Sequence, residues 1–284
     1  MAQLLKGKEV AEALQEKDLK LINELKEKGI TPTLMVFKVG NKDSDLSYLK
    51  GINKKSETLG VKVILKEYEE DIDPAVLYKD LDQANSDSDV DGILIFRPLP
   101  KQFNDDELRN RINVNKDVDG CSDLSLGSIF INKDQGYFPC TAQAVVEILD
   151  HYGIQISGKN ITIIGRSLVI GKPLSMMLLN RNATVTVCHS RSKDIEKISS
   201  RADILVCASG QMESITKNYV NKDMTIIDVG ISWNEAKQKL CGDVLFEEVE
   251  PCVKAITPVP GGVGAVTTAV LLDHVVESAD RKTK

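Results

Sequence analysis

Short apolar segments alternate with amphipathic segments along most of the chain, and this alternation constrains the fold more than any other feature. The segments TLMVFKV from Thr33, VKVILKE from Val61 and GILIF from Gly92 are rich in β-branched and aromatic residues, as strands are. Between them, residues 46–59 and 75–84 have the apolar spacing of helices. The pattern predicts an α/β sheet domain in the first half of the chain.

The second half repeats the alternation from Asn160 onward. The strand-like segments NITIIG, ATVTVCH, ADILVCA and MTIIDVG are separated by helical spacing at residues 170–179 and 194–200. Strands and helices that alternate at this pace are typical of a doubly wound parallel sheet, the Rossmann-like arrangement.

The two halves meet near residue 140. There FPCT precedes a helical segment that Thr141 could cap and Gly153 could end. A further helical segment, AVTTAVLLDHVVESA, follows the last strand of the second half. We therefore expect a first domain over residues 1–140 plus a returning C-terminal helix, 266–284, and a Rossmann-like domain over residues 141–265.

Charge and hydropathy exclude several classes of partner. The chain has 36 basic and 42 acidic residues, a net charge of −6, so we expect no nucleic acid partner. The longest uncharged stretch, 255–272, contains prolines and glycines that a membrane-spanning helix would avoid, so we expect no membrane partner. Lys6 and Lys8 stand where a signal peptide would have its apolar core, which favours a cytoplasmic location.

Cysteine and histidine spacing gives no sign of a metal site. The six cysteines lie far apart without a CxxC pair, and the three histidines are scattered. We expect reduced thiols, no structural disulfides and no bound metal.

A glycine-spaced turn follows the strand at Asn160, in the segment NITIIGRSLVIGKP. Gly165 ends the strand and Gly171 opens a helix, which would let backbone N–H groups approach a phosphate at the helix N-terminus. The spacing differs from GxGxxG, and an ordinary tight connection between strand and helix is the alternative reading.

The end of the next strand indicates which dinucleotide would bind. An unphosphorylated ribose usually meets Asp or Glu there, but this chain has Ser190 and Arg191. With Arg166, these residues offer hydroxyl and guanidinium donors that suit a 2′-phosphate. The sequence therefore favours NADP over NAD.

Three other features have both a functional and a structural interpretation. ITPVPGGVGAVTTA, residues 256–269, is either a stiff backbone wall of a cleft or an ordinary turn between domains. The carboxylates of KDVDG, residues 116–120, could bind a metal, orient the amines of a substrate or cap the turn. Tyr48 on its helix could pack or function.

Taken together, these segments resemble the bifunctional methylenetetrahydrofolate dehydrogenase/methenyltetrahydrofolate cyclohydrolase family. Seven motifs occur in the family's order: VGNKDSDLSY, DGILIFRPLP, KDVDG, FPCT, GRSLVIGKP, DVGI and TPVPGGVG. The resemblance implies two domains with a cleft between them, tetrahydrofolate bound by the first, NAD(P) by the second, and a homodimer. It also implies oxidation of 5,10-methylenetetrahydrofolate to the methenyl compound in one-carbon metabolism, and hydrolysis of that product to 10-formyltetrahydrofolate.

The resemblance also implies site residues by position. Tyr48 would stack on the folate and Asp119 would hold its ring, and both are the candidate catalytic residues. The pocket wall would consist of Pro260, Gly261, Gly262, Val263 and Gly264. The cofactor would contact Gly165, Arg166, Ser167, Ser190 and Ile231, and the residues at the end of the second strand add Arg191 to this set.

Two positions depart from the family at the hydrolytic step, which needs a group to handle protons. The family's lysine four residues after the tyrosine is Ile52 here, and its glutamine in QxPLP is Phe96. We therefore expect a dehydrogenase whose cyclohydrolase activity is weak or absent.

Neighbouring cations do not replace the missing lysine on an ideal helix. At about 100° per residue, Lys50 points roughly opposite the Tyr48 face and Lys54 lies off to its side. Lys55 shares the face but lies about 10 Å further along the axis. Arg97, another departure from the family, could bring a charge if its segment turned inward.

Two other functions remain open from the sequence. One is an NADP-binding protein without catalytic activity, and the other is a dehydrogenase of another small substrate such as shikimate. The intact GRS, DVGI and PGGVG strings weigh against the first, and Tyr48 with KDVDG weighs against the second.

Overall fold

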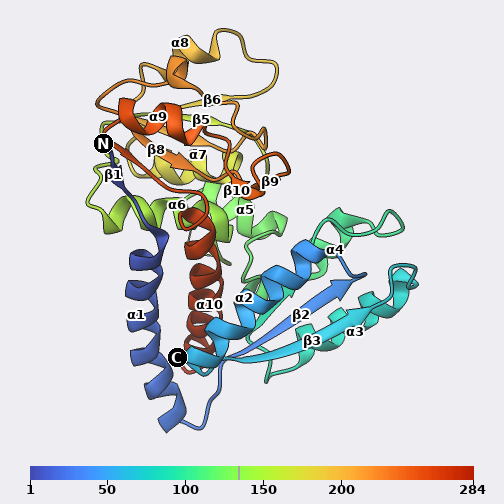
Figure 1. Ribbon diagram of the computed structural model, residues 1–284. Coiled ribbons are helices and arrows are strands. Elements are labelled where there is room, and N and C mark those ends of the chain that lie inside the picture. The colour runs from blue at the N-terminus through green and yellow to red at the C-terminus, as the bar shows by residue number, and fades with distance from the viewer. Residues whose placement is uncertain (134) are drawn as a thin grey trace. The chain divides into compact units, whose positions relative to one another are not determined.

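The computed structural model describes residues 1–133 and 135–284, and its strands and helices alternate as the sequence predicts (Figure 1). By packing, the chain forms two compact units. Unit 1 consists of Met1–Glu12 and Thr141–Thr267, and unit 2 of Ala13–Cys140 and Thr268–Lys284. The long helices α1 (Gly7–Glu27) and α10 (Val263–Arg281) contribute residues to both.

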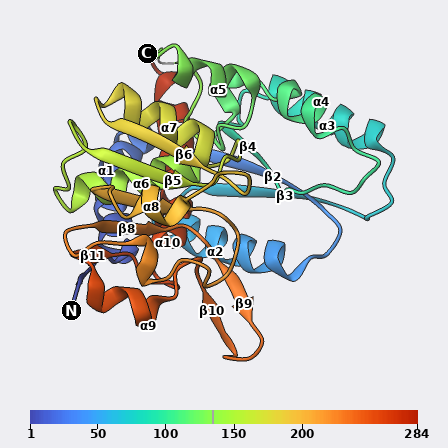
Figure 2. The same cartoon turned by 90° about the horizontal axis from the view of Figure 1, so that it is seen from above.

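Unit 2 is built on a parallel sheet with the strand order β3-β2-β4. Its strands are β2 (Thr33–Val39), β3 (Lys62–Tyr68) and β4 (Gly92–Ile95). Figure 2 shows α2 (Asp43–Leu59) on one side of β2 and β3, and α3 (Pro74–Ser86) with α4 (Asp105–Arg111) on the other. All seven residues of β2 are buried, because helices cover the sheet.

The helix ends of unit 2 follow local chemistry. Gly60 ends α2 with a φ of +82°, a left-handed conformation that glycine adopts without strain. Asp73 caps α3 by accepting a hydrogen bond from the Ala75 N–H, and Pro74 occupies the first turn. A short helix η1 (Val114–Lys116) and α5 (Asp123–Phe130) complete the unit before residue 140.

The C-terminal helix α10 returns to the first half of the chain, as the sequence predicts. Ser278 Oγ donates hydrogen bonds to the carbonyl oxygens of Asp91 (2.7 Å) and Asn115 (3.0 Å). Residues 268–279 of this helix are all buried except Glu277, which is half-buried. The helix is therefore part of the core of unit 2.

Unit 1 contains a parallel sheet of six strands in the order β1-β11-β8-β7-β5-β6. Its four longer strands are β5 (Asn160–Ile164), β6 (Thr184–Cys188), β7 (Ile204–Cys207) and β8 (Thr225–Asp228), and β6 lies at the edge. The chain runs from β5 to β6 on one side and then crosses to β7 on the other. That reversal is the switch point where doubly wound sheets bind ligands, beyond the carboxyl ends of the strands.

The edge of this sheet brings the N-terminus into unit 1. Strand β1 (Gln3–Leu4) pairs in parallel with β11 (Ala255–Ile256), so residues 1–12 pack with unit 1. Packing therefore differs here from the predicted functional ranges, which placed residues 1–140 in one domain. Those functional ranges stay a prediction.

The other elements of unit 1 are short except for α6 and α7. They are α6 (Cys140–His151), α7 (Gly171–Asn180), α8 (Ile195–Ser199), η2 (Lys217–Tyr219), α9 (Phe246–Val249), η3 (Glu250–Cys252) and a hairpin of β9 (Ser232–Asn234) and β10 (Lys239–Cys241). The prediction that Thr141 caps α6 is wrong, because the helix begins at Cys140 and Thr141 is its second residue. Within the described residues, no helix is both long and apolar enough to span a membrane.

Candidate active site

The KDVDG turn of unit 2 is fixed by its first carboxylate. Asp117 is fully buried and accepts hydrogen bonds from the Cys121 N–H (3.0 Å), the Ser122 N–H (2.9 Å) and Ser125 Oγ (2.7 Å). Gly120 has a φ of +64°, and a Cβ there would lie 2.4 Å from the carbonyl carbon of Phe138. Asp117 therefore caps the turn, and only glycine fits at position 120.

The carbonyl group of Val118, between the two aspartates, is fixed by contacts with His274 and Cys140. His274 Nδ1 lies 2.7 Å from this oxygen, and Cys140 Sγ lies 3.2 Å from it. Burial lowers the pKa of His274, so the ring is neutral, and the Nδ1–H donates because a carbonyl oxygen can only accept. Helix α10 thus fixes the backbone that presents Asp119.

Asp119, the second carboxylate of the turn, is in a different environment. Its side chain is 29% exposed, its Oδ2 lies 3.5 Å from Arg97 Nη2, and the Cys140 thiol hydrogen-bonds to it. Burial raises the pKa of Asp119 to about 6, against the opposing effect of the Arg97 charge. The Asp117 carboxylate adds to the upward shift. Asp119 is therefore a carboxylate whose protonation changes just below neutral pH.

Tyr48, on the second turn of α2, lies in the same neighbourhood. Its ring packs against the Phe96 ring with centroids 5.5 Å apart and planes tilted by 33°. Burial raises the pKa of the Tyr48 hydroxyl well above its usual value, and the nearby Cys140 and Asp119 groups add to the shift. The hydroxyl stays protonated at neutral pH, and unit 2 brings together the two residues that the sequence proposes as catalytic.

The positions of the family's lysine and glutamine are apolar and buried. Ile52 has no exposed surface, and Phe96 is 5% exposed. Lys55, one turn further along α2, is half-buried, and burial lowers its pKa. Neither Ile52 nor Phe96 can transfer a proton.

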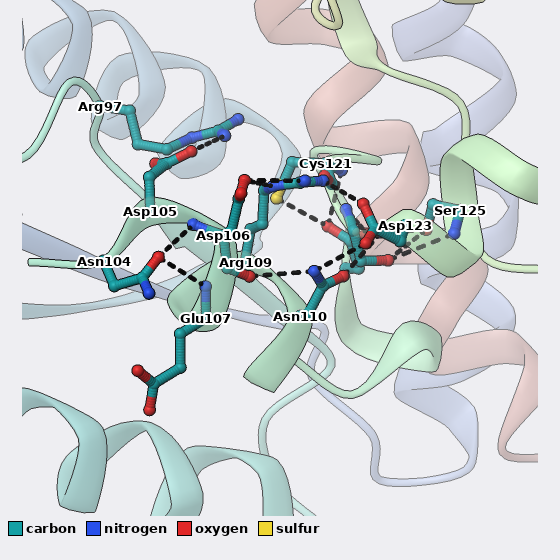
Figure 3. Close-up of polar contacts among 12 residues, drawn as sticks. Arg97, Asn104, Asp105, Asp106, Glu107, Arg109, Asn110, Cys121, Asp123 and Ser125 are labelled. Carbon is teal, nitrogen blue, oxygen red and sulfur yellow. Dashed lines mark hydrogen bonds and ion pairs between the residues drawn. The ribbon is translucent and has the colours of Figure 1, made fainter.

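A second arginine ties α4 to the chain after the turn (Figure 3). Arg109 pairs with Asp106 on its own helix, donates to the Cys121 carbonyl oxygen (3.1 Å) and pairs with Asp123 at the start of α5 (2.5 Å). Asn104 caps α4 by accepting hydrogen bonds from the N–H groups of the first turn. The sequence gives no sign of this arrangement, because the residues that form it share no motif.

In unit 1, the glycine-spaced turn is a tightly packed connection from β5 to α7. Gly165 has a φ of +137°, and a Cβ there would lie 2.2 Å from the Ala208 carbonyl oxygen. A Cβ on Gly171 would lie 2.1 Å from the Gly165 carbonyl oxygen. No side chain caps the N-terminus of α7, but the Lys172 N–H donates to the Ser167 carbonyl oxygen (3.0 Å) and Pro173 has no N–H. The positive end of the helix dipole is what this turn offers a phosphate group.

The predicted cofactor side chains lie along one edge of this sheet. Ile164 pairs with Cys188, so the chain leaves β5 and β6 at the same level, where Ser167 and Arg191 follow. The side chains of this group are exposed: Arg166, Ser167, Ser190 and Arg191. Ile231 is 62% exposed and follows β8, whose carboxyl end lies at the same edge.

Two buried aspartates beside this edge escaped the sequence analysis. Asp228 ends β8 and accepts hydrogen bonds from the N–H groups of Gly230, Asp243 and Val244, and burial raises its pKa to about 7. Asp243 accepts from the N–H groups of Ser209 and Gly210. Both carboxylates fasten loops at the carboxyl ends of the strands. For Asp228, the sequence feature that could have indicated its role is its position directly after the apolar segment TII.

The PVPGGVG segment packs against the N-terminus of α1 within unit 1. The Gly7 N–H donates to the Gly261 carbonyl oxygen (2.8 Å), and a Cβ on Gly7 would lie 2.0 Å from the Gly262 oxygen. Of the five predicted pocket residues, Pro260, Gly261 and Gly264 are exposed, whereas Gly262 and Val263 are buried. Gly262 and Val263 could therefore line a pocket only through their backbone atoms.

The described residues contain no group of His, Cys, Asp and Glu side chains that could hold a metal ion. The two carboxylates of KDVDG have different partners. Asp117 accepts hydrogen bonds from backbone N–H groups, and Asp119 pairs with Arg97. At this site, unit 2 offers the partly exposed carboxylate of Asp119 and the aromatic ring of Tyr48.

Comparison with protein families matches both parts of the chain. The model of the tetrahydrofolate dehydrogenase/cyclohydrolase catalytic domain covers residues 5–119, and that of the NAD(P)-binding domain of the same family covers residues 139–283. A bifunctional protein FolD of Clostridium botulinum (strain Hall) is 48% identical over 282 residues, 99% of each chain.

Solved structures agree with these matches. The bifunctional FolD methylenetetrahydrofolate dehydrogenase/cyclohydrolase of Campylobacter jejuni has a TM-score of 0.96 and 36% identity, covering 99% of this chain and 100% of that one. The Trypanosoma brucei enzyme, solved with NADP and an inhibitor, has a TM-score of 0.94 and 29% identity, covering 100% and 99%. The chain therefore belongs to the tetrahydrofolate dehydrogenase/cyclohydrolase family.

Proposed function

We propose that this protein oxidises 5,10-methylenetetrahydrofolate to 5,10-methenyltetrahydrofolate with NADP, as a step of one-carbon metabolism. The observation that carries the proposal is the Tyr48–Asp119 neighbourhood, within a chain that matches both domains of one folate-oxidising family. Membership of that family also weighs against a dehydrogenase of an unrelated small substrate.

In unit 2, Asp119 would accept hydrogen bonds from N–H groups of the folate ring while Tyr48 stacks on it. A carboxylate accepts such bonds well only when it is ionised, and a pKa of about 6 leaves Asp119 ionised at neutral pH. The raised pKa of Tyr48 keeps its ring neutral, which suits stacking. These residues supply binding and orientation, which is most of what the oxidation requires.

In unit 1, the residues fit a dinucleotide. The close-packed turn at Gly165 leads to the N-terminus of α7, whose dipole favours a phosphate, and the exposed Arg166 and Ser167 follow Gly165 in that turn. A dinucleotide held by these residues would supply the acceptor for the hydride, that is, for the hydrogen and the electron pair of the C–H bond that breaks at the methylene bridge. Because no proton is released in that step, the chain needs no strong base for it.

The preference for NADP over NAD is carried by the end of β6. Residues 189–193 read His-Ser-Arg-Ser-Lys, without the carboxylate that commonly binds an unmodified ribose. The exposed side chains of Ser190 and Arg191 can both donate to a 2′-phosphate.

We also propose that the hydrolytic activity of the family is weak or absent here. Ile52 lies in the core and Phe96 packs on Tyr48, so neither replaces the lysine and glutamine that the family has at these positions. If hydrolysis is found, Lys55 is the group to replace first, because it is a half-buried amine on the same helix as Tyr48 and burial lowers its pKa.

One preparation assayed twice tests both statements. The first assay follows NADP reduction with 5,10-methylenetetrahydrofolate, with NAD in parallel, and the second follows the loss of methenyltetrahydrofolate absorbance above the uncatalysed rate. We expect oxidation with a preference for NADP and no accelerated hydrolysis. A preparation that binds NADP but oxidises no folate would instead indicate a binding protein without catalytic activity.

The functional ranges, quaternary structure and location belong to the same proposal. Residues 1–140 with 266–284 would carry folate binding, residues 141–265 would carry NADP binding, and the protein would be a cytoplasmic homodimer. Family resemblance supports the homodimer, and sedimentation equilibrium of the purified protein would test it.

A further inference from the structure

Arg97 is a charged residue at the folate side of the site that the reaction described above does not use. It follows β4 and Phe96, and its side chain is 23% exposed. Its Nη2 lies 3.5 Å from Asp119 Oδ2, and its Nη1 lies 3.7 Å from Asp105 Oδ2 on α4. The guanidinium therefore lies between a candidate substrate-binding carboxylate and a second carboxylate that holds it (Figure 3 shows the Asp105 side).

We propose that Arg97 is a positioning residue that keeps Asp119 ionised and oriented to accept hydrogen bonds from the N–H groups of the folate ring. This inference rests on the proposed function. It assigns to Arg97 no contact with the reacting atoms. Its effect on the reaction passes through Asp119.

The groups around Asp119 explain why a cation is needed there. Asp117 and Cys121 belong to the same turn, Tyr48 comes from α2, and Cys140 comes from the start of α6. Burial raises the pKa of the Tyr48, Cys121 and Cys140 groups, so all three are neutral at neutral pH, and Asp117 is a second negative charge. His274 from α10 contacts the turn through Val118 and is neutral as well.

Among these groups, Arg97 supplies the opposite charge. Burial and the Asp117 carboxylate favour the protonated form of Asp119, and the Arg97 charge favours the ionised form. A protonated carboxyl would lose acceptor capacity toward the folate ring, because one oxygen becomes a donor. Losing Arg97 would therefore weaken folate binding below neutral pH.

Asp105 keeps the Arg97 side chain in place when the substrate binds. It stands in the first turn of α4, which Asn104 caps, and it stays paired with Arg97 if Asp119 turns its oxygens toward a ligand. The Arg97 guanidinium therefore stays beside Asp119, because its ion pair with Asp105 remains.

The test is the pH profile of kcat/KM for 5,10-methylenetetrahydrofolate at saturating NADP, for the wild type, Arg97→Met and Arg97→Lys. We expect the acid limb of Arg97→Met to move to higher pH by about one unit, since a nearby opposite charge shifts a carboxyl pKa by that order. At pH 6 the loss would appear in KM more than in kcat, and Arg97→Lys would keep the wild-type limb. Arg111→Met, which breaks an exposed ion pair with Asp82, is the matched control and should not move the limb.

An acid limb of Arg97→Met that coincides with the wild type overturns the inference, as does an equal shift in Arg97→Lys. If Arg97→Met does not fold by circular dichroism, Arg97→Gln removes the charge while keeping donors, and the same outcomes apply. If the wild type oxidises no folate, the proposed function fails instead. The Asp119 carboxyl band in infrared difference spectra against Asp119→Asn then still tests Arg97, because its titration should move to higher pH without the guanidinium.

Discussion

Asp117 and Asp119 stand two positions apart in one turn, and their surroundings give them different chemistry. Four donors, including the Cys121 thiol, surround the fully buried carboxylate of Asp117 and fill its acceptor capacity. Asp119 has one long ion pair, partial exposure and a pKa raised to about 6. At this scale, hydrogen-bond saturation decides which carboxylate is structural and which can bind substrate.

Restoring the family's lysine and glutamine at positions 52 and 96 tests whether their loss weakens hydrolysis. In Ile52→Lys with Phe96→Gln, we expect methenyltetrahydrofolate hydrolysis to rise by at least about tenfold, because a positioned acid/base group contributes that much or more. We also expect a lower melting temperature, since position 52 is fully buried and a lysine there is costly. Ile52→Met with Phe96→Gln is the matched control without the amine. A double variant that folds, oxidises folate and hydrolyses no faster would contradict the explanation.

The proposed preference for NADP can be tested at Arg191. For Arg191→Ala we expect KM for NADP to rise about tenfold and KM for NAD to change little, since only NADP has the 2′-phosphate that a guanidinium binds. The measurement is oxidation of methylenetetrahydrofolate with each cofactor in turn. Arg201→Ala, at another exposed arginine of unit 1, serves as the control. Equal changes for both cofactors would show that Arg191 does not bind the 2′-phosphate.

Among the elements, α1 and α10 share a buried acidic contact in unit 2. Asp18 and Asp273 are each 2% exposed and hydrogen-bond to each other, while Lys17 pairs with Asp273 (2.8 Å) and Glu277 (3.2 Å). Burial, followed by the bond to Asp273, holds the pKa of Asp18 well above its usual range. Asp18 therefore carries a proton in the folded state at neutral pH.

This contact makes stability fall with rising pH. Unfolded Asp18 loses its proton above about pH 4, whereas folded Asp18 keeps it, so the free energy of unfolding falls as pH rises from there toward the raised pKa. Asp18→Asn is neutral at every pH and can still donate to Asp273. We expect the variant to gain stability over the wild type progressively from pH 5 to pH 8 in urea titrations. Asp71→Asn, at an exposed position, should show no such trend, and a constant difference between Asp18→Asn and wild type would contradict the argument.

In the whole molecule, the chain enters unit 1, passes into unit 2, returns to unit 1 and ends in unit 2. Neither unit is a continuous segment. The core of unit 2 includes the buried α10 residues Val270, Leu271 and Val275 and the bond from His274 to Val118. The last turns of the chain are thus needed to complete a unit whose sheet is formed within the first hundred residues.

A fragment of residues 1–140 should therefore not fold alone. Without α10, apolar surface that is buried in the full chain is exposed, the Asp91 carbonyl oxygen loses the Ser278 hydroxyl, and the Val118 carbonyl oxygen loses His274. We expect no cooperative thermal transition by circular dichroism, and a transition on addition of a peptide of residues 263–284. A fragment that unfolds cooperatively without the peptide would show that α10 is dispensable for unit 2.

The sequence by itself determined the order of strands and helices, the two sheets and the family, because these depend on hydrophobic periodicity and on short motifs such as KDVDG. It proposed Tyr48 and Asp119 together, and the structure places them in one neighbourhood. The sequence missed β1, α4, α5 and the β9–β10 hairpin, which are short or have weak periodicity.

Only the tertiary structure decided how charges and carbonyl groups are paired. Arg97 meets Asp119 across 22 positions, Lys17 meets Asp273 across 256, and His274 meets Val118 across 156. The physical reason is that a local pattern records which side of a segment is apolar, whereas burial, pKa and hydrogen-bond saturation depend on which distant side chains exclude water from the same place.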